Sequence, residues 1–519
     1  MAIKYVSQTA TNGYAIGSDA NDGSTKALAK LTLEAAITAA TAGDTVILND
    51  GTYTAATYYD VAKALTINPE IAGMVTLKCT GAVGQVLRVG VDGGTIALGA
   101  LIVDAESNSA ASCVAINGTT ARGVTLNGTI LKNPGAPRFA VESINSGQVL
   151  TFTATDIVVQ SQNGGGGIYL LVGAAALVDI DGLSADNSAG SGSSTTIRCP
   201  VYINANAATA THRIRRVSGT WKTTAAAVSA SFIRTSGTRG IIERNRGMRV
   251  TGGDTNGCII KCENTSGVQA DSLVIRNNQG GNETTGGYLI MVGADGAGAN
   301  DNKTNYPVIY GNDVYGTDAA TLIHGIFIGN SKGGVITRNT VRNAAIPIIA
   351  KLTSEAAYIV DNDVIGPYTS TSGCLRGKGA TNLQIVGNRV VLSSGKTNPA
   401  IVINRDPTIP TLSAGCSAVG NTVYSSVTVP VMVSVGGASD ASAATFMGNN
   451  YRSPEGYSAG AFVYQALSYN TVALWSAAQE KSALDADPTK SDASFWRDAY
   501  VPMLQSALSA AYPHLLPMY

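Results

Sequence analysis

The chain has 519 residues, of which 35 are basic and 35 acidic, so its formal net charge is zero. A balanced charge predicts no bulk electrostatic attraction to nucleic acid or to an anionic membrane surface. No stretch of about 18 uninterrupted apolar residues predicts a membrane span, and the 59 glycines favour short strands and tight turns over long helices.

The first 44 residues predict an N-terminal segment that carries a capping helix. This segment has no apolar core of a secretory signal, so we expect a protein made in the cytoplasm. Apolar residues over 31–40 fall on one side of a helix, and we expect Gly43 to end it. The first strand is then expected at residues 45–48.

An asparagine recurs inside the same apolar frame through the second half of the chain. The intervals range from 23 residues (Asn339 to Asn362) to 35 residues (Asn277 to Asn312). A period of 20–50 residues is typical of a solenoid. We expect each asparagine to adopt the left-handed backbone of a corner and to form a hydrogen-bonded ladder between coils. The members are Asn245, Asn277, Asn312, Asn339, Asn362, Asn388, Asn421 and Asn449.

Short apolar runs form a second series, with one run before each asparagine and further runs upstream. Each repeat therefore holds at least two short strands, which can pair with the equivalent strands one coil away, about 4.8 Å along the axis. This arithmetic predicts a parallel β-helix over residues 45–455. The runs begin at Cys113, Phe139, Gly167, Pro200, Ser231, Cys258, Tyr288, Gly325, Pro347, Cys374, Ala400 and Pro430.

Residues 456–519 predict a short, partly helical C-terminal cap or tail. Trp496 and Leu504 could pack this tail against the last coil, and a subunit contact is the alternative.

The seven cysteines are odd in number and lack a CxxC pair, which favours free, buried thiols. The glycine run at 163–168 lacks the lysine of a phosphate loop, and the sequence predicts neither a cofactor nor a metal site.

Both ends of the repeat carry motifs that resemble the right-handed parallel β-helix superfamily, the pectate-lyase-like group. Its members include polysaccharide lyases, glycoside hydrolases and bacteriophage tailspikes. The resemblance implies an all-β fold, a right-handed single-stranded parallel β-helix, and, among tailspikes, a homotrimer. It rests on "GSDANDGSTK", "AGDTVIL" and "GTY" near the N-terminus and on "TVALWSAAQEKSALDADP" at 471–488, with Trp475, Ser482 and Asp487–Pro488.

Candidate catalytic residues are carboxylates on the coils or on the long insertion after Val292. Carboxylates on adjacent coils would lie about 5 Å apart and suit a retaining glycosidase, whereas those two coils apart, at about 10 Å, would suit an inverting one. A lyase would instead need a base and a charge stabiliser. We expect an acid–base pair drawn from Glu263, Asp295 and Asp301, with Glu243 in reserve.

Cations at the ends of the second strand series suggest a row that binds an acidic glycan, and a solvated face is the alternative. Trp221 could stack on a sugar ring or pack in the core. His324 borders a strand and is more readily structural than catalytic. The expected substrate-binding residues are Trp221, Arg234, Lys261, Tyr306, Lys351, Lys378 and Arg405.

The sequence therefore favours a phage tailspike-like receptor-binding protein that recognises, and could depolymerise, bacterial surface polysaccharide such as capsule or lipopolysaccharide. The expected setting is the virion tail, after synthesis in the host cytoplasm, as a homotrimer attached through its C-terminal tail or through other phage tail proteins. A non-catalytic virion protein or adhesin is one alternative. A stand-alone polysaccharide lyase or hydrolase is the other.

Overall fold

The chain divides into two compact units, Met1–Lys261 and Cys262–Tyr519. The computed structural model describes residues 1–481 except 82–83, 91–93, 107–110, 119–120, 136–137, 144, 146, 163, 189–198, 206–208, 224–230, 253–255, 265–271, 294–303, 318–321, 352–353, 367–372, 393–398, 405–412, 426–431, 437–443, 454–456, 458–460 and 466.

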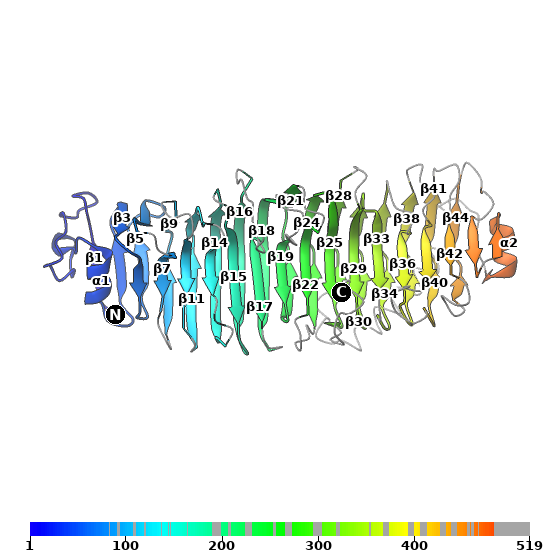
Figure 1. Ribbon diagram of the computed structural model, residues 1–519, viewed down its shortest axis with the longest axis horizontal. Coiled ribbons are helices and arrows are strands. Elements are labelled where there is room, and N and C mark those ends of the chain that lie inside the picture. Colours follow the sequence, from blue (N-terminus) through cyan, green and yellow to red (C-terminus); the bar gives the residue numbers. More distant parts are fainter. Residues whose placement is uncertain are drawn as a thin grey trace. The chain divides into compact units, whose positions relative to one another are not determined.

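The first unit winds through three strand positions per coil, which we name faces I, II and III (Figure 1). Face I holds β1 (Ile3–Val6), β2 (Thr45–Leu48), β5 (Thr66–Pro69), β8 (Thr95–Leu98), β11 (Arg122–Asn127) and β20 (Arg239–Glu243). Face II holds β3 (Gly51–Ala55), β6 (Val75–Cys79), β9 (Ile102–Asp104), β12 (Ile130–Lys132) and β21 (Met248–Gly252). Three long strands pass from face I to face II: β14 (Leu150–Gln160), β16 (Leu177–Asp186) and β18 (Thr211–Thr223). Face III holds β4 (Tyr59–Val61), β7 (Gln85–Val89), β10 (Ser112–Ile116), β13 (Phe139–Ser143), β15 (Gly166–Val172), β17 (Val201–Ala205) and β19 (Ser231–Ser236).

The second unit repeats the same three faces, and β22 (Cys258–Glu263) crosses the boundary between the units. Its face I holds β23 (Leu273–Arg276), β27 (Val308–Tyr310), β31 (Val335–Thr337), β34 (Tyr358–Val360), β37 (Gln384–Val386), β40 (Ser417–Val419), β43 (Thr445–Met447) and β47 (Glu480–Lys481). Its face II holds β24 (Gln279–Glu283), β28 (Asp313–Gly316), β32 (Thr340–Arg342), β35 (Asp363–Ile365), β38 (Arg389–Leu392), β41 (Thr422–Ser425) and β44 (Asn450–Arg452). Its face III holds β25 (Gly286–Gly293), β29 (Leu322–Gly329), β33 (Ile346–Lys351), β36 (Leu375–Lys378), β39 (Ile401–Asn404), β42 (Val433–Val435), β45 (Phe462–Tyr464) and the antiparallel β46 (Leu467–Tyr469). A small pair, β26 (Thr304–Asn305) and β30 (Ser331–Lys332), lies outside these faces.

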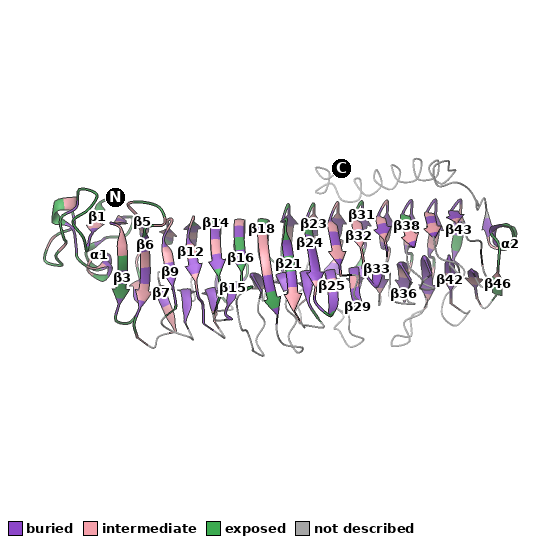
Figure 2. Cartoon of the chain, turned by 90° about the horizontal axis from the view of Figure 1, so that it is seen from above, coloured by how far each residue is buried: buried purple, intermediate pink, exposed green. Residues whose placement is uncertain are grey.

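Strands pair in parallel with the equivalent strand of the next coil and not with their neighbours in sequence. Val308, Val335, Tyr358, Gln384 and Ser417, for example, follow one another in register along face I. The alternate residues of these strands that form the core are apolar and almost fully buried. Figure 2 shows buried residues along the strands of both units. The predicted fold class, an all-β right-handed parallel β-helix, is confirmed.

The N-terminal cap differs from its prediction in two details. The first strand is β1, which pairs in parallel with β2 and so extends face I by one strand. The helix α1 (Leu33–Ala39) begins after the N-cap Thr32 and ends at Ala40 in an extended conformation, so Gly43 does not end it. A short 3-10 turn, η1 (Lys26–Leu28), precedes the helix.

The recurrent asparagines form a buried ladder at the corner between faces I and II of the second unit. In each step the side-chain oxygen of one asparagine accepts hydrogen bonds from the backbone and side-chain nitrogens of the previous one. Asn339 Oδ1, for instance, accepts from Asn312 N at 3.0 Å and from Asn312 Nδ2 at 2.8 Å. The ladder runs through Asn278, Asn312, Asn339, Asn362, Asn388, Asn421 and Asn449.

Two sequence predictions about this corner are wrong. The ladder member on the first of these coils is Asn278, not Asn277. The left-handed backbone belongs to the residue before each ladder asparagine: Asn277 has φ 54° and Arg338 has φ 52°. The asparagine side chain therefore serves the hydrogen-bonded ladder, while the preceding residue makes the turn.

The first unit turns the same corner with apolar residues. Ile157, Leu183 and Val217 are in register and buried there. Asn245 follows them, accepting at Oδ1 from Val217 N at 2.8 Å. Because β14, β16 and β18 continue through this corner as unbroken strands, their coils carry no asparagine signal in the sequence.

The last described coil ends the ladder with a carboxylate. Glu480 Oε1 accepts from Asn449 N and Nδ2 at 2.8 and 2.7 Å, and its Oε2 accepts from Tyr451 Oη and Trp475 Nε1. Trp475 lies in α2 (Val472–Ala478) and is fully buried. Four parts of the predicted C-terminal cap lie outside the described residues, so their predicted roles stay predictions: Ser482, Asp487–Pro488, Trp496 and Leu504.

All seven cysteines are free and buried, as the sequence predicts for small apolar core residues. Trp221 on β18 is also fully buried, so it packs in the core and cannot stack on a sugar ring.

His212 on the same strand is buried beside Val178 and Gly240, and neither ring nitrogen has a hydrogen-bond partner. Burial lowers the pKa of His212 from 6.5 to about 3.

The ladder predicts a large stability difference between two asparagines. Asn339→Ala removes the acceptor of Asn312 and the donor to Ile309 O, so buried polar groups lose their partners at about 1–3 kcal/mol each. We expect a clearly lower thermal unfolding midpoint for this variant. The exposed Asn277→Gly, which keeps the left-handed turn, should leave the midpoint nearly unchanged, and equal losses in both variants would contradict the assignment.

Because His212 is buried in its neutral form, we predict that the free energy of unfolding of the first unit falls in acid. Since the pKa of His212 is lowered in the folded chain, the unfolded chain binds more protons below pH 6.5, and stability falls as the pH falls. The loss approaches about 1.4 kcal/mol per pH unit. His212→Val should remove this component in urea unfolding between pH 4.5 and 7.5, and an unchanged pH slope would refute it.

Candidate functional site

Face III of the first unit presents an outward row of polar and aromatic side chains on successive coils. Strand side chains alternate, so the residues between two inward positions share one register on the outside. Glu142, Tyr169, Tyr202 and Arg234 follow one another in this register, and we call them the tyrosine–arginine row. The inward neighbours of this row are fully buried: Val141, Ile168, Val201 and Ile233.

The aromatic rings of the row stack from coil to coil. Phe139 and Tyr169 have centroids 4.9 Å apart and nearly parallel planes, and Tyr169 and Tyr202 follow at 5.2 Å. The Arg234 guanidinium lies 4.9 Å from the centroid of Tyr202, within cation–π distance. A continuous stack therefore extends from β13 to β19, with a cation at one end.

Glu142 places a carboxylate at the other end of the stack. Its oxygens accept from Arg138 at 3.1 Å and from the Ser112 hydroxyl at 3.0 Å. The preceding residues of the same register are Ala115, Arg88 and Asp60, and Arg88 is paired with Asp60. Three coils separate the two described carboxylates of the row, about 14 Å, which is too far for a glycosidase pair.

The tyrosines of the row are suited to contact rather than to proton transfer. Burial raises the pKa of both Tyr169 and Tyr202, so neither phenol ionises near neutral pH. Their hydroxyls are held in hydrogen bonds with Asn204 and Ser236. Tyr169 is half-buried whereas Tyr202 is 6% exposed, so Tyr169 offers the accessible ring.

The structure places the predicted cations in different surroundings. Arg234 belongs to the tyrosine–arginine row, and Lys261 is almost buried on β22. Lys351 and Lys378 lie in register on adjacent coils of the second unit, followed by Asn404. Arg405 lies outside the described residues.

The predicted acid–base residues are not brought together within the described part of the chain. Glu263 is half-buried at the end of β22, while Asp295 and Asp301 lie outside the described residues. Tyr306 lies at a left-handed turn (φ 51°) before β27. The reserve candidate Glu243 is 2% exposed and paired with Arg213 at 3.2 Å.

Other features of the described residues are structural. The His324 ring packs against Tyr288 at 5.0 Å. Over the described ranges, no three His, Cys, Asp or Glu side chains gather as metal ligands. Neither described helix has the length and apolar character needed to cross a membrane.

Sequence reasoning missed Glu142, Tyr169 and Tyr202, although it identified the runs that contain them. The row occupies the fourth residue of one run and the third residue of the other two, so it does not keep one place when the runs are aligned by their first residues: "FAVE" ends in Glu142, "GIYL" contains Tyr169 and "PVYI" contains Tyr202. Aligning the runs by their alternating apolar positions would have placed these three residues in one register.

No family model matches the chain, and no curated protein matches it in sequence. Among solved structures it resembles the mannuronan C-5 epimerase AlgE6 A-module of Azotobacter vinelandii, with 14% identity, 88% of this chain and 94% of that chain covered, and a TM-score of 0.35. It also resembles a mannuronic acid specific polysaccharide family 6 lyase from human gut microbiota, with 13% identity, coverages of 86% and 87%, and a TM-score of 0.35. A third similar structure is a family 6 polysaccharide lyase of Pseudopedobacter saltans, with 12% identity, coverages of 93% and 94%, and a TM-score of 0.29. At these values the likenesses assign no function to this chain.

Proposed function

We propose that this protein recognises a bacterial surface polysaccharide along the tyrosine–arginine row, in the manner of a phage tailspike-like receptor-binding protein. The observation that carries the proposal is the in-register stack of Glu142, Tyr169, Tyr202 and Arg234 on four successive coils. An extended polymer needs repeated contacts along one direction, and a β-helix face supplies one contact per coil.

The chemistry of the row suits a sugar chain. A half-buried tyrosine ring offers an apolar, rigid surface to the C–H face of a pyranose. Around it, the Glu142 carboxylate and the Asn204 amide can bond hydroxyl groups, and the Arg234 guanidinium can bond hydroxyls or a carboxylate of the glycan. Aromatic side chains accompanied by a small number of directed polar groups are typical of specific ligand sites.

The described geometry favours recognition over cleavage. The row lacks a second carboxylate within glycosidase distance among its described members, and the raised pKa values disfavour its tyrosines as bases. An adhesin or non-catalytic virion protein is therefore the second candidate. Depolymerisation by Glu263, Asp295 and Asp301, as in a lyase or hydrolase, remains the sequence prediction.

The proposed setting is a virion tail assembled in the host cytoplasm. Seven free, buried thiols support folding in a reducing compartment. A homotrimer, and attachment to other tail proteins, complete the tailspike proposal.

Tyr169→Ala should weaken polysaccharide binding about 5- to 30-fold, because it removes a stacking contact of roughly 1–2 kcal/mol. Tyr169→Phe keeps the ring and should retain most of the affinity. Biolayer interferometry with purified capsule and lipopolysaccharide preparations measures both. Tyr424→Ala, on face II of the second unit, is the matched control and should bind as the parent protein does.

Incubation of the same preparations with the protein, followed by chromatography of the released oligosaccharides, separates a depolymerase from a binder. Size-exclusion chromatography with light scattering tests the trimer. Failure of every polysaccharide to bind, or unchanged binding by Tyr169→Ala, would refute the proposed recognition surface.

A further inference from the structure

Face II of the first unit carries two shallow cavities, open to solvent, that the tyrosine–arginine row does not use. Both lie on the coils of β14, β16 and β18. The larger, of about 290 Å³, begins at the corner and is lined by Asp156, Gly182, Ser184, Arg216 and Ser218 together with apolar residues. The smaller, of about 180 Å³, lies at the far ends of β14 and β16.

The charges beside the larger cavity cancel one another. Arg216 pairs with Asp156 at 3.1 Å and also with Asp181, and Arg215 pairs with Asp181 at 3.0 Å. Two cations and two anions leave no net charge, so the cavity favours neither a phosphate nor a metal ion. Its remaining polar groups are the hydroxyls of Ser184 and Ser218.

Gly182 makes room for the Asp156 carboxylate at the edge of the larger cavity. Its φ is +84°, and a Cβ atom at this position would lie 2.2 Å from Asp156 Oδ1. Any other side chain here would meet both a strained backbone and a collision with the carboxylate. The glycine therefore lets the Asp156 carboxylate lie over this coil, where it pairs with Arg216 of the coil beyond.

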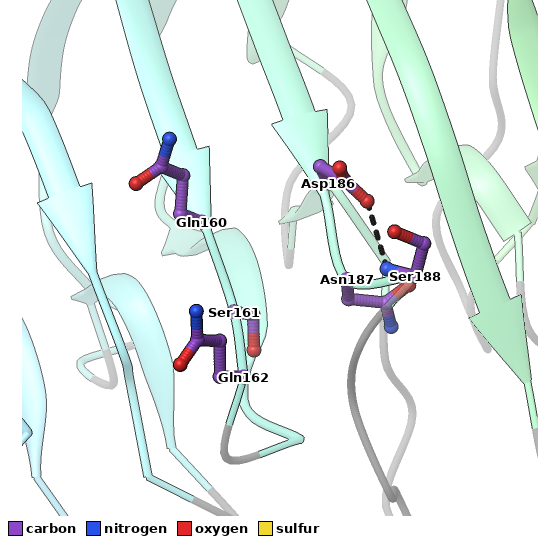
Figure 3. Close-up of a pocket in the computed structure, with 6 residues that line it drawn as sticks. All are labelled: Gln160, Ser161, Gln162, Asp186, Asn187 and Ser188. Carbon is purple, nitrogen blue, oxygen red and sulfur yellow. Dashed lines mark hydrogen bonds between the residues drawn. The ribbon is translucent and has the colours of Figure 1, made fainter.

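The smaller cavity is lined by uncharged hydrogen-bonding groups and one carboxylate (Figure 3). Gln160 and Gln162 project from one coil and are exposed, and Asp186 and Ser188 stand on the next coil, with Gln160 and Asp186 in register. Asp186 Oδ1 accepts from Ser188 N at 2.7 Å, which uses one of its two oxygens.

The two remaining members of the lining, Ser161 and Asn187, have structural roles: the Ser161 hydroxyl donates to Gly165 O at 2.8 Å, and Asn187 bonds the neighbouring coil. Its Nδ2 donates to Lys222 O at 3.0 Å, and its Oδ1 accepts from Lys222 N at 2.5 Å. These bonds tie β16 to β18 and hold the adjacent Asp186 and Ser188 in place. The amides of Gln160 and Gln162 are thus the principal ligand-facing groups of this cavity.

The two cavities follow one another along β14, because Val158 lines the larger and Gln160 lines the smaller. These two residues are roughly 7 Å apart at the rise of a strand. We propose that this face is a second glycan site that binds a neutral oligosaccharide running along β14 and β16, one sugar unit in each cavity. Amide and hydroxyl groups match vicinal hydroxyls as donors and acceptors. A cavity below the 300–1,000 Å³ of drug-sized ligands suits a single sugar unit.

The test uses saturation-transfer NMR on the full chain with neutral tetrasaccharides of glucose, mannose, galactose and N-acetylglucosamine. Trigalacturonate, inorganic phosphate and Ca²⁺ are the charged probes. At least one neutral tetrasaccharide should bind, and Gln160→Ala/Gln162→Ala should weaken it about tenfold or more, since two hydrogen-bonding amides are lost. Gln8→Ala, an exposed glutamine in the N-terminal segment, is the matched control.

Tyr169→Ala should leave this binding unchanged, which separates the second site from the tyrosine–arginine row. Circular dichroism and an unchanged unfolding midpoint establish that the double variant is folded. Binding of charged probes alone, binding that the double variant does not weaken, or no binding of any neutral tetrasaccharide would each overturn the proposal.

Discussion

Hydrogen bonding between equivalent strands of successive coils is the interaction on which the rest of this structure depends. A strand such as β31, three residues long, has too few backbone groups to be stable with its sequence neighbours. It is stable because β27 and β34 satisfy its backbone on both sides. Register then follows, since a shift by one residue would turn the buried isoleucines of face I outward.

The corners carry a second set of interactions that extend the same ladder where strand pairing stops. In the second unit, each asparagine satisfies the corner backbone of the coil before it, as Asn362 does for Asn339. The last member, Asn449, meets Glu480 instead, and burial raises the pKa of that carboxyl group. Four donors around Glu480 offset part of the free-energy cost of burying its carboxylate. Both carboxylate oxygens therefore have hydrogen-bond partners where the ladder ends.

The repeat made the fold predictable from the sequence, whereas the details of each turn were not. "RNN" at 276–278 fits the asparagine frame in two ways, and only the pairing of Val274 with Val308 selects Asn278 over Asn277. Likewise, Arg234 was identified from its charge, but Tyr169 and Tyr202 gain their meaning from stacking across coils that lie 33 and 32 residues apart. Spacing along the chain predicts that strands stack. Which side chains meet outside the stack depends on register to a single residue, and loops of variable length hide that register in the sequence.

The same register argument limits where a polymer can lie on face III. In the second unit an outward register of face III reads Met291, Phe327, Ile349, Arg376, Val402 and Ser434, and its first three side chains are buried, with exposures of 4%, 0% and 3%. Buried side chains of this kind offer little surface to a ligand. In the first unit the tyrosine–arginine row places a carboxylate, two aromatic rings and a guanidinium on four successive coils. Glu142 and Tyr202 are 8% and 6% exposed, whereas Tyr169 and Arg234 are only half-buried. A half-buried ring beside a guanidinium offers a surface that a ligand can contact, which is why the proposed polysaccharide contact lies on the first unit.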